Sequence, residues 1–122
     1  TQNEFDLSLT AETYFKVGSQ FNLVWFRDQI ANDSREGHWN TMARLSLRDE
    51  LDNLQRRLTI AILTTNTKER TSEKLINYWL EQNHPIQKRW EKLLEMLLGS
   101  ENIDYTIFFI ALRELSSLIQ VL

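Results

Sequence analysis

The two histidines, His38 and His84, are the residues best suited to acid–base chemistry in this 122-residue sequence, which contains no cysteine. A nucleophilic triad needs a serine or cysteine beside a histidine that a carboxylate orients. Neither histidine lies in a G-x-S-x-G or similar motif. His38 precedes Trp39 where a loop should meet a helix, and His84 precedes Pro85. Both histidines are therefore predicted to be capping or surface residues.

A metal site is suggested by one short motif, Glu81-Gln82-Asn83-His84, which has the Glu-x-x-His spacing. In carboxylate-bridged helical bundles this spacing places two ligands on one helix face, but such a centre uses two motifs and further inward glutamates. The sequence has a single motif, at the predicted end of a helix. We therefore predict no metal ligands.

Paired carboxylates and glycine-rich phosphate loops are the other common signatures of chemistry. The acidic residues Asp49, Glu50 and Asp52 lie opposite or beside an apolar helix seam, and Asp52 is spaced for an ordinary i,i+4 pair with Arg56. The three glycines are isolated from one another. These patterns predict a solvated helix face and no nucleotide-binding loop.

Charge and hydropathy indicate whether nucleic acid or membrane is an expected partner. Basic residues accompany an aromatic one at Lys88, Arg89, Trp90 and Lys92, but acidic residues are interspersed and the net charge is −3, so nucleic acid is not expected. The longest apolar run, residues 107–112, is far shorter than the roughly 20 residues of a membrane span. No membrane partner is expected, and the lack of cysteine favours a cytoplasmic location.

The element that dominates the sequence is a long amphipathic helix predicted from His38 to Asn66. Its apolar residues recur at spacings of four and three, which is typical of a helix with one buried seam. They are Leu47, Leu51, Leu54, Leu58 and Ala61. The seam is long enough for several neighbouring helices to pack against it.

Other helical segments are delimited by capping and helix-breaking residues. Ser8 or Thr10 is expected to cap the first helix, and Thr71 or Ser72 to cap a helix that follows a break over residues 64–72. Gly99 should end the helix that carries Trp90. The fold class predicted is all-α: a single domain over residues 1–122, forming an antiparallel helical bundle of about five to six helices around one long central helix.

Two features point beyond the fold. Trp25 lies off the apolar face of its helix and is predicted to point outward, whereas the other tryptophans are predicted to be core. The sequence begins with Thr1 rather than methionine, so we interpret it as a fragment of a larger protein. A free-standing helical interaction module that binds a partner helix remains the alternative, with the nearly all-round apolar last helix as its contact face.

Four motifs in order suggest a family. They are Y-F-x-x-G (residues 14–18), L-x-W-x-R (23–27), W-x-x-x-A-R-x-x-L-R-D-x-L (39–51) and L-Q-x-x-L (54–58), and A-L-R-E-L follows within residues 109–118. Their order and spacing resemble the C-terminal region of the large bacterial NAD-specific glutamate dehydrogenases.

The resemblance implies a parent enzyme of amino-acid catabolism that oxidatively deaminates L-glutamate to 2-oxoglutarate and ammonia with NAD. In that family the catalytic lysine and the dinucleotide-binding domain lie upstream of this region. The fragment is therefore expected to contain no catalytic, cofactor-binding or metal residue, and to be non-catalytic itself. Its expected partners are the remainder of the parent chain and other subunits of a homo-oligomer.

The matched positions are expected to be structural or contact residues. They are Tyr14, Gly18, Trp25, Arg27, Trp39, Arg44, Arg48, Asp49 and Gln55. One specific hypothesis is that Arg27, Arg44 or Arg48 pairs with Asp28 or Asp49 where the first helices meet the long one.

Overall fold

The computed structural model describes residues 6–32, 41–99 and 105–119. These residues form six α-helices and no strand, which confirms the all-α prediction. The helices are α1 (Leu7–Gln20), α2 (Leu23–Asn32), α3 (Thr41–Leu63), α4 (Ser72–Gln82), α5 (His84–Gly99) and α6 (Tyr105–Leu118).

Local capping chemistry explains where two of the helices begin. Asp6 caps α1, since its side chain accepts a hydrogen bond from the backbone N–H of Leu9, so the predicted caps Ser8 and Thr10 were wrong. All three residue types suit this position, and Asp6 adds a negative charge at the positive end of the helix dipole. Thr71 caps α4 as predicted, accepting from Lys74 N–H.

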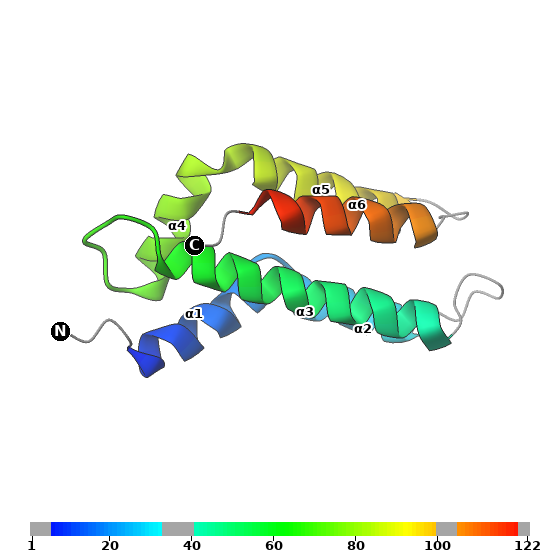
Figure 1. Cartoon of the computed structure of the whole chain (residues 1–122), viewed down its shortest axis with the longest axis horizontal. Helices are drawn as coiled ribbons and strands as arrows, with labels where there is room; N and C mark the ends of the chain where they lie inside the picture. Colours follow the sequence, from blue (N-terminus) through cyan, green and yellow to red (C-terminus); the bar gives the residue numbers. More distant parts are fainter. Residues whose placement is uncertain (1–5, 33–40, 100–104, 120–122) are drawn as a thin grey trace.

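Asn22 joins α1 to α2 with a positive φ of 56°. Asparagine tolerates this left-handed conformation better than most residues. The Asn22 carbonyl then accepts the backbone N–H of Phe26, so α2 starts without an intervening loop. The two short helices consequently follow one another along the same side of α3 (Figure 1).

The apolar seam predicted for the long helix is confirmed. Leu47, Leu51, Leu54, Leu58 and Ala61 are all buried on α3, which ends three residues earlier than predicted, at Leu63. The predicted start, residues 38–40, lies outside the described residues. α3 contacts α1, α2, α4 and α6, so burial of its seam joins most of the fold.

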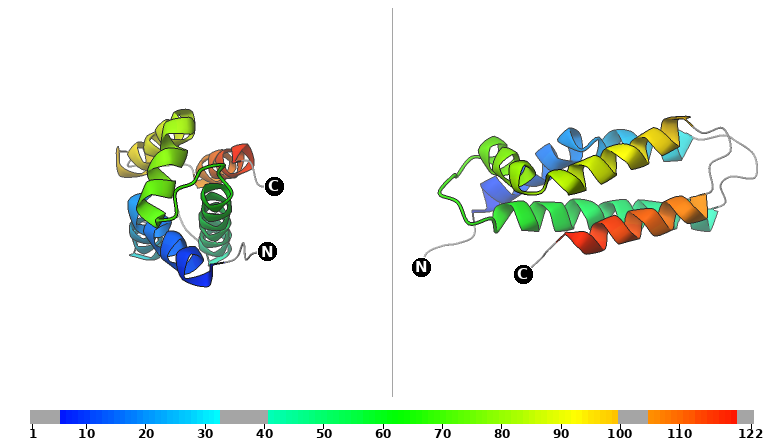
Figure 2. Two further views of the ribbon diagram at one scale, coloured as in Figure 1. Left: turned by 90° about the vertical axis from the view of Figure 1, so that its left-hand side faces the viewer. Right: turned by 90° about the horizontal axis from the view of Figure 1, so that it is seen from above.

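The long helices lie roughly side by side, and α4 crosses them at one end (Figures 1 and 2). α3 runs opposite to α1 and α2, and α6 runs opposite to α5, but the neighbours α3 and α6 run in the same direction. The bundle is therefore not antiparallel throughout. Within the described residues, no helix combines the length and apolarity needed to cross a membrane.

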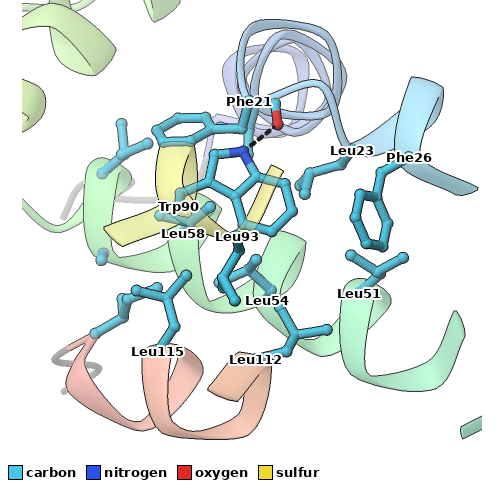
Figure 3. Close-up of a cluster of buried hydrophobic side chains, with 14 of the residues drawn as sticks. Phe21, Leu23, Phe26, Leu51, Leu54, Leu58, Trp90, Leu93, Leu112 and Leu115 are labelled. Carbon is cyan, nitrogen blue, oxygen red and sulfur yellow. Dashed lines mark hydrogen bonds between the residues drawn. The ribbon is translucent and has the colours of Figure 1, made fainter. Parts of the chain in front are cut away.

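Aromatic residues join the two halves of the core. Phe26 of α2 stacks on Phe108 of α6 at a centroid distance of 5.2 Å and lies 5.6 Å from the ring of Trp90 of α5. The Trp90 indole N–H donates to the Phe21 carbonyl at 2.6 Å (Figure 3). This bond satisfies a buried donor and fixes α5 against the α1–α2 junction.

Candidate functional site

The residues best suited to chemistry do not converge. Glu81 and His84 are both exposed at the α4–α5 junction, so their spacing produces no inward-facing ligand pair. His38 lies outside the described residues. Across the described ranges, no group of three or more metal-ligating side chains is close enough to hold an ion.

The acidic residues of α3 contact separate partners. Glu50 accepts a hydrogen bond from Asn53 and lies 3.9 Å from Arg113 of α6. Asp52 pairs with Arg27 of α2, and Asp49 is exposed. These three carboxylates therefore do not form the arrangement that acid–base catalysis requires.

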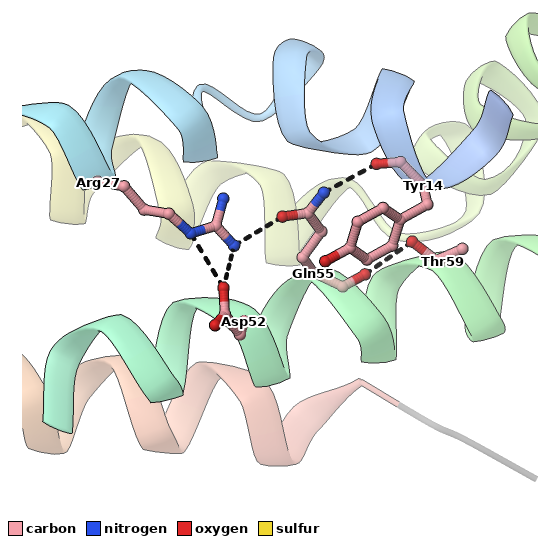
Figure 4. Close-up of polar contacts among 5 residues, drawn as sticks. All are labelled: Tyr14, Arg27, Asp52, Gln55 and Thr59. Atoms are coloured by element: carbon pink, nitrogen blue, oxygen red, sulfur yellow. Dashed lines mark hydrogen bonds and ion pairs between the residues drawn. The ribbon is translucent and has the colours of Figure 1, made fainter. Parts of the chain in front are cut away.

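A polar network between α1, α2 and α3 brings several of the predicted residues together (Figure 4). The Arg27 guanidinium donates to Asp52 Oδ1 through Nε at 3.0 Å and Nη2 at 2.6 Å. Nη2 also donates to Gln55 Oε1 at 2.7 Å. A single arginine thus binds two side chains of α3 one helical turn apart.

Gln55 is the buried centre of this network, with 3% of its surface exposed. Its Oε1 accepts from Arg27, and its Nε2 donates to the Tyr14 carbonyl at 2.9 Å. The Gln55 carbonyl accepts from the Thr59 hydroxyl at 2.7 Å. Since an unpaired buried amide is costly, the two bonds to the Gln55 side chain fix its orientation, and the bond to Tyr14 holds α1 close to α3.

Gly18 allows α1 to approach the Gln55 amide. A Cβ atom at this position would lie 2.8 Å from Gln55 Nε2 and 3.4 Å from its Cδ. The first distance is shorter than van der Waals contact, so any larger residue requires the amide to move. The glycine is therefore explained by the close approach of a second helix.

The network includes four of the nine matched positions: Tyr14 through its carbonyl, Gly18, Arg27 and Gln55. Trp25, Arg48 and Asp49 are exposed and outside it. Trp39 lies outside the described residues, as does the side chain of Arg44.

The hypothesis of an arginine pair at this junction was right about Arg27 but wrong about its partner. Arg27 binds Asp52, not Asp28 or Asp49, and Asp52 is therefore not the free i,i+4 partner of Arg56 that its spacing suggested. Sequence reasoning missed Asp52 and Thr59. The available signal was that Asp52, Gln55 and Thr59 follow one another at spacings of three and four, which places them on one side of the helix.

An open groove of about 1050 Å³ lies beside the network, between α1, the C-terminal end of α3 and residues 64–70. We call it the α1–α3 groove. Three threonine hydroxyls on its wall already donate to backbone carbonyls: Thr59 to Gln55, Thr64 to Ile60 and Thr65 to Ala61. The described lining also includes Leu9, Ile60 and Leu63, so part of the groove is apolar.

Comparisons with known proteins agree on one family. Residues 1–117 match the family model described as "Glutamate dehydrogenase, C-terminal". Over 115 residues the chain is 36% identical to an NAD-specific glutamate dehydrogenase of Pseudomonas aeruginosa, which covers 94% of this chain and 7% of that protein. Over 108 residues it is 30% identical to an NAD-specific glutamate dehydrogenase of Halomonas elongata, covering 88% and 7%.

The chain thus spans about 7% of the length of each of these relatives. No solved structure matches it significantly.

Proposed function

Because this chain belongs to the family of glutamate dehydrogenase C-terminal domains, we propose that it is the non-catalytic C-terminal helical domain of a bacterial, cytoplasmic NAD-specific glutamate dehydrogenase. The parent enzyme oxidatively deaminates L-glutamate to 2-oxoglutarate and ammonia with NAD. This domain supports folding of the parent and contacts between its domains or subunits.

The observation that carries the proposal is the family match over residues 1–117. NAD as cofactor of the parent is supported by the names of both relatives. A structural role is supported by the geometry of the polar network, in which the side chains of Arg27 and Gln55 form hydrogen bonds with other helices of the same domain. The reacting groups then belong to the part of the parent outside this chain.

Removing the domain from the full parent enzyme tests the proposal. We expect deletion of residues 1–122 to reduce the yield of soluble, correctly assembled enzyme, measured by size-exclusion chromatography and by glutamate-dependent NADH formation. The point substitution Leu51→Asp, which places a charge in the core of α3, should reproduce the loss. Ser117→Asp, at an exposed position of α6, is the matched control and should not.

A parent enzyme unchanged in yield, assembly and turnover after the deletion would contradict this function. The size of the native polypeptide distinguishes the proposed function from the alternative of a free-standing interaction module. An antibody against this chain should detect a protein many times longer than 122 residues. A band corresponding to 122 residues alone would favour the free-standing module.

A further inference from the structure

We propose that the α1–α3 groove binds an apolar segment with a carboxylate side chain, supplied by the part of the parent polypeptide that precedes this domain. This inference rests on the proposed function and identifies the surface through which the domain contacts its parent. Three observations support it: the lining of the groove, its cationic rim and its position at the start of α1.

The groove has an apolar lining in which Ile60 is exposed, Leu9 and Leu63 are partly buried and Leu75 is buried. Leu9 of α1, Ile60 and Leu63 of α3, and Leu75 of α4 line it. Ile60 is 41% exposed although it lies beside buried residues of the same helix. An apolar side chain seated here would cover Ile60 and gain the free energy of removing both surfaces from water.

Two arginines give the groove a preference for negative charge. Both line the groove and are exposed: Arg56 belongs to α3, and Arg70 to the segment between α3 and α4. Arg70 Nη1 donates to the carbonyls of Thr67 and Glu69, which holds its guanidinium in place. Asp6 is the one carboxylate among the lining residues that the structure describes, and it accepts the capping hydrogen bond from Leu9 N–H. An incoming carboxylate would therefore meet two guanidinium groups, which bind it with directed hydrogen bonds.

The position of the groove favours the parent polypeptide as its occupant. Asp6 and Leu9 line the groove at the beginning of α1, so the chain that leads into the domain starts at its edge. In the relatives this region is only 7% of the protein, so ample polypeptide is available. A segment tethered this close has a high effective concentration at the groove, which an untethered second copy lacks.

Photocrosslinking in the full-length parent enzyme tests the assignment. Benzoylphenylalanine is placed at position 60, in the groove, or at position 96 on α5 as the matched control, since Ile60 and Met96 are each 41% exposed. We expect position 60 to give intramolecular crosslinks to peptides upstream of this domain, identified by mass spectrometry, with a yield at least about tenfold above that of position 96. Arg56→Glu should reduce the crosslinking yield from position 60 several-fold. Arg89→Glu, at an exposed position of α5, should leave that yield unchanged.

Three results would overturn the assignment: equal yields from the two positions, no product from position 60, or product only between two copies of the chain. The deletion experiment keeps the two proposals separate. If removing residues 1–122 leaves the parent unchanged, the proposed function fails. If removal disables the parent but position 60 captures nothing upstream, only the docking surface is wrong.

Discussion

Replacing Gly18 with alanine should destabilise this domain, although alanine is the better helix former. Within a helix, glycine to alanine ordinarily stabilises by about 0.5–1 kcal/mol. Here the new Cβ would lie 2.8 Å from Gln55 Nε2, so the buried amide must move. The gain in helix propensity therefore competes with the hydrogen bonds that hold the amide.

The cost of moving Gln55 follows from its two partners. Loss of the bond to the Tyr14 carbonyl costs about 1 kcal/mol, and loss of the charge-assisted bond from Arg27 costs about 1.5–3 kcal/mol. After the gain in helix propensity is subtracted, the free energy of unfolding should fall by about 2 kcal/mol. In a Gln55→Ala background the obstructing amide is absent, so the same Gly18→Ala change should stabilise by about 0.5–1 kcal/mol.

Urea denaturation of the four proteins of this double-mutant cycle, followed by circular dichroism at 222 nm, measures the change in unfolding free energy caused by Gly18→Ala in each background. With a slope of about 1–3 kcal/mol/M, Gly18→Ala alone should lower the midpoint by about 1 M. Ser19→Ala, at the exposed next position of α1, reports the effect of helix propensity without the contact. If Gly18→Ala stabilises the wild-type chain, or has the same sign in both backgrounds, the close-approach explanation is refuted.

Further substitutions test other buried contacts by the same denaturation assay. Trp90→Phe leaves the Phe21 carbonyl without its indole donor and should cost about 1–3 kcal/mol; an unchanged midpoint would show that this bond contributes nothing net. Arg27→Lys should cost about 1–2 kcal/mol, because an ammonium group does not reproduce the fork that binds both α3 partners, and full retention of stability would contradict this role. Ser116→Ala should raise stability by about 1 kcal/mol, since the buried hydroxyl has no hydrogen-bond partner among the described residues; a decrease would indicate a partner.

The features of the fold that the sequence predicts are local ones. The seam of α3 follows from a spacing of four and three, and Thr71 and Gly99 mark helix ends by their residue types. The first cap was missed because Asp6, Ser8 and Thr10 are all suitable, and residue type alone does not choose among them. Local pattern therefore defines the existence of a helix better than its first residue.

The tertiary partners were harder to predict. Arg27 and Asp52 are 25 residues apart, and their pairing depends on how α2 lies along α3. Asp28 and Asp49 have the same charge as Asp52, so the sequence offers no electrostatic reason to prefer one carboxylate. Similarly, helix lengths and short loops do not reveal that α3 and α6 are neighbours running in the same direction.

The hydrogen bond between Phe21 and Trp90 also has a consequence for biosynthesis. Its two residues are 69 positions apart, so at a translation rate of about 5–20 residues per second the carbonyl exists for roughly 3–14 s before its donor is made. Helical bundles commonly fold in microseconds to milliseconds once complete. Synthesis rather than folding therefore limits when the Phe21–Trp90 bond can form. Until Trp90 has been made, the first three helices must remain soluble without the indole that covers Phe21.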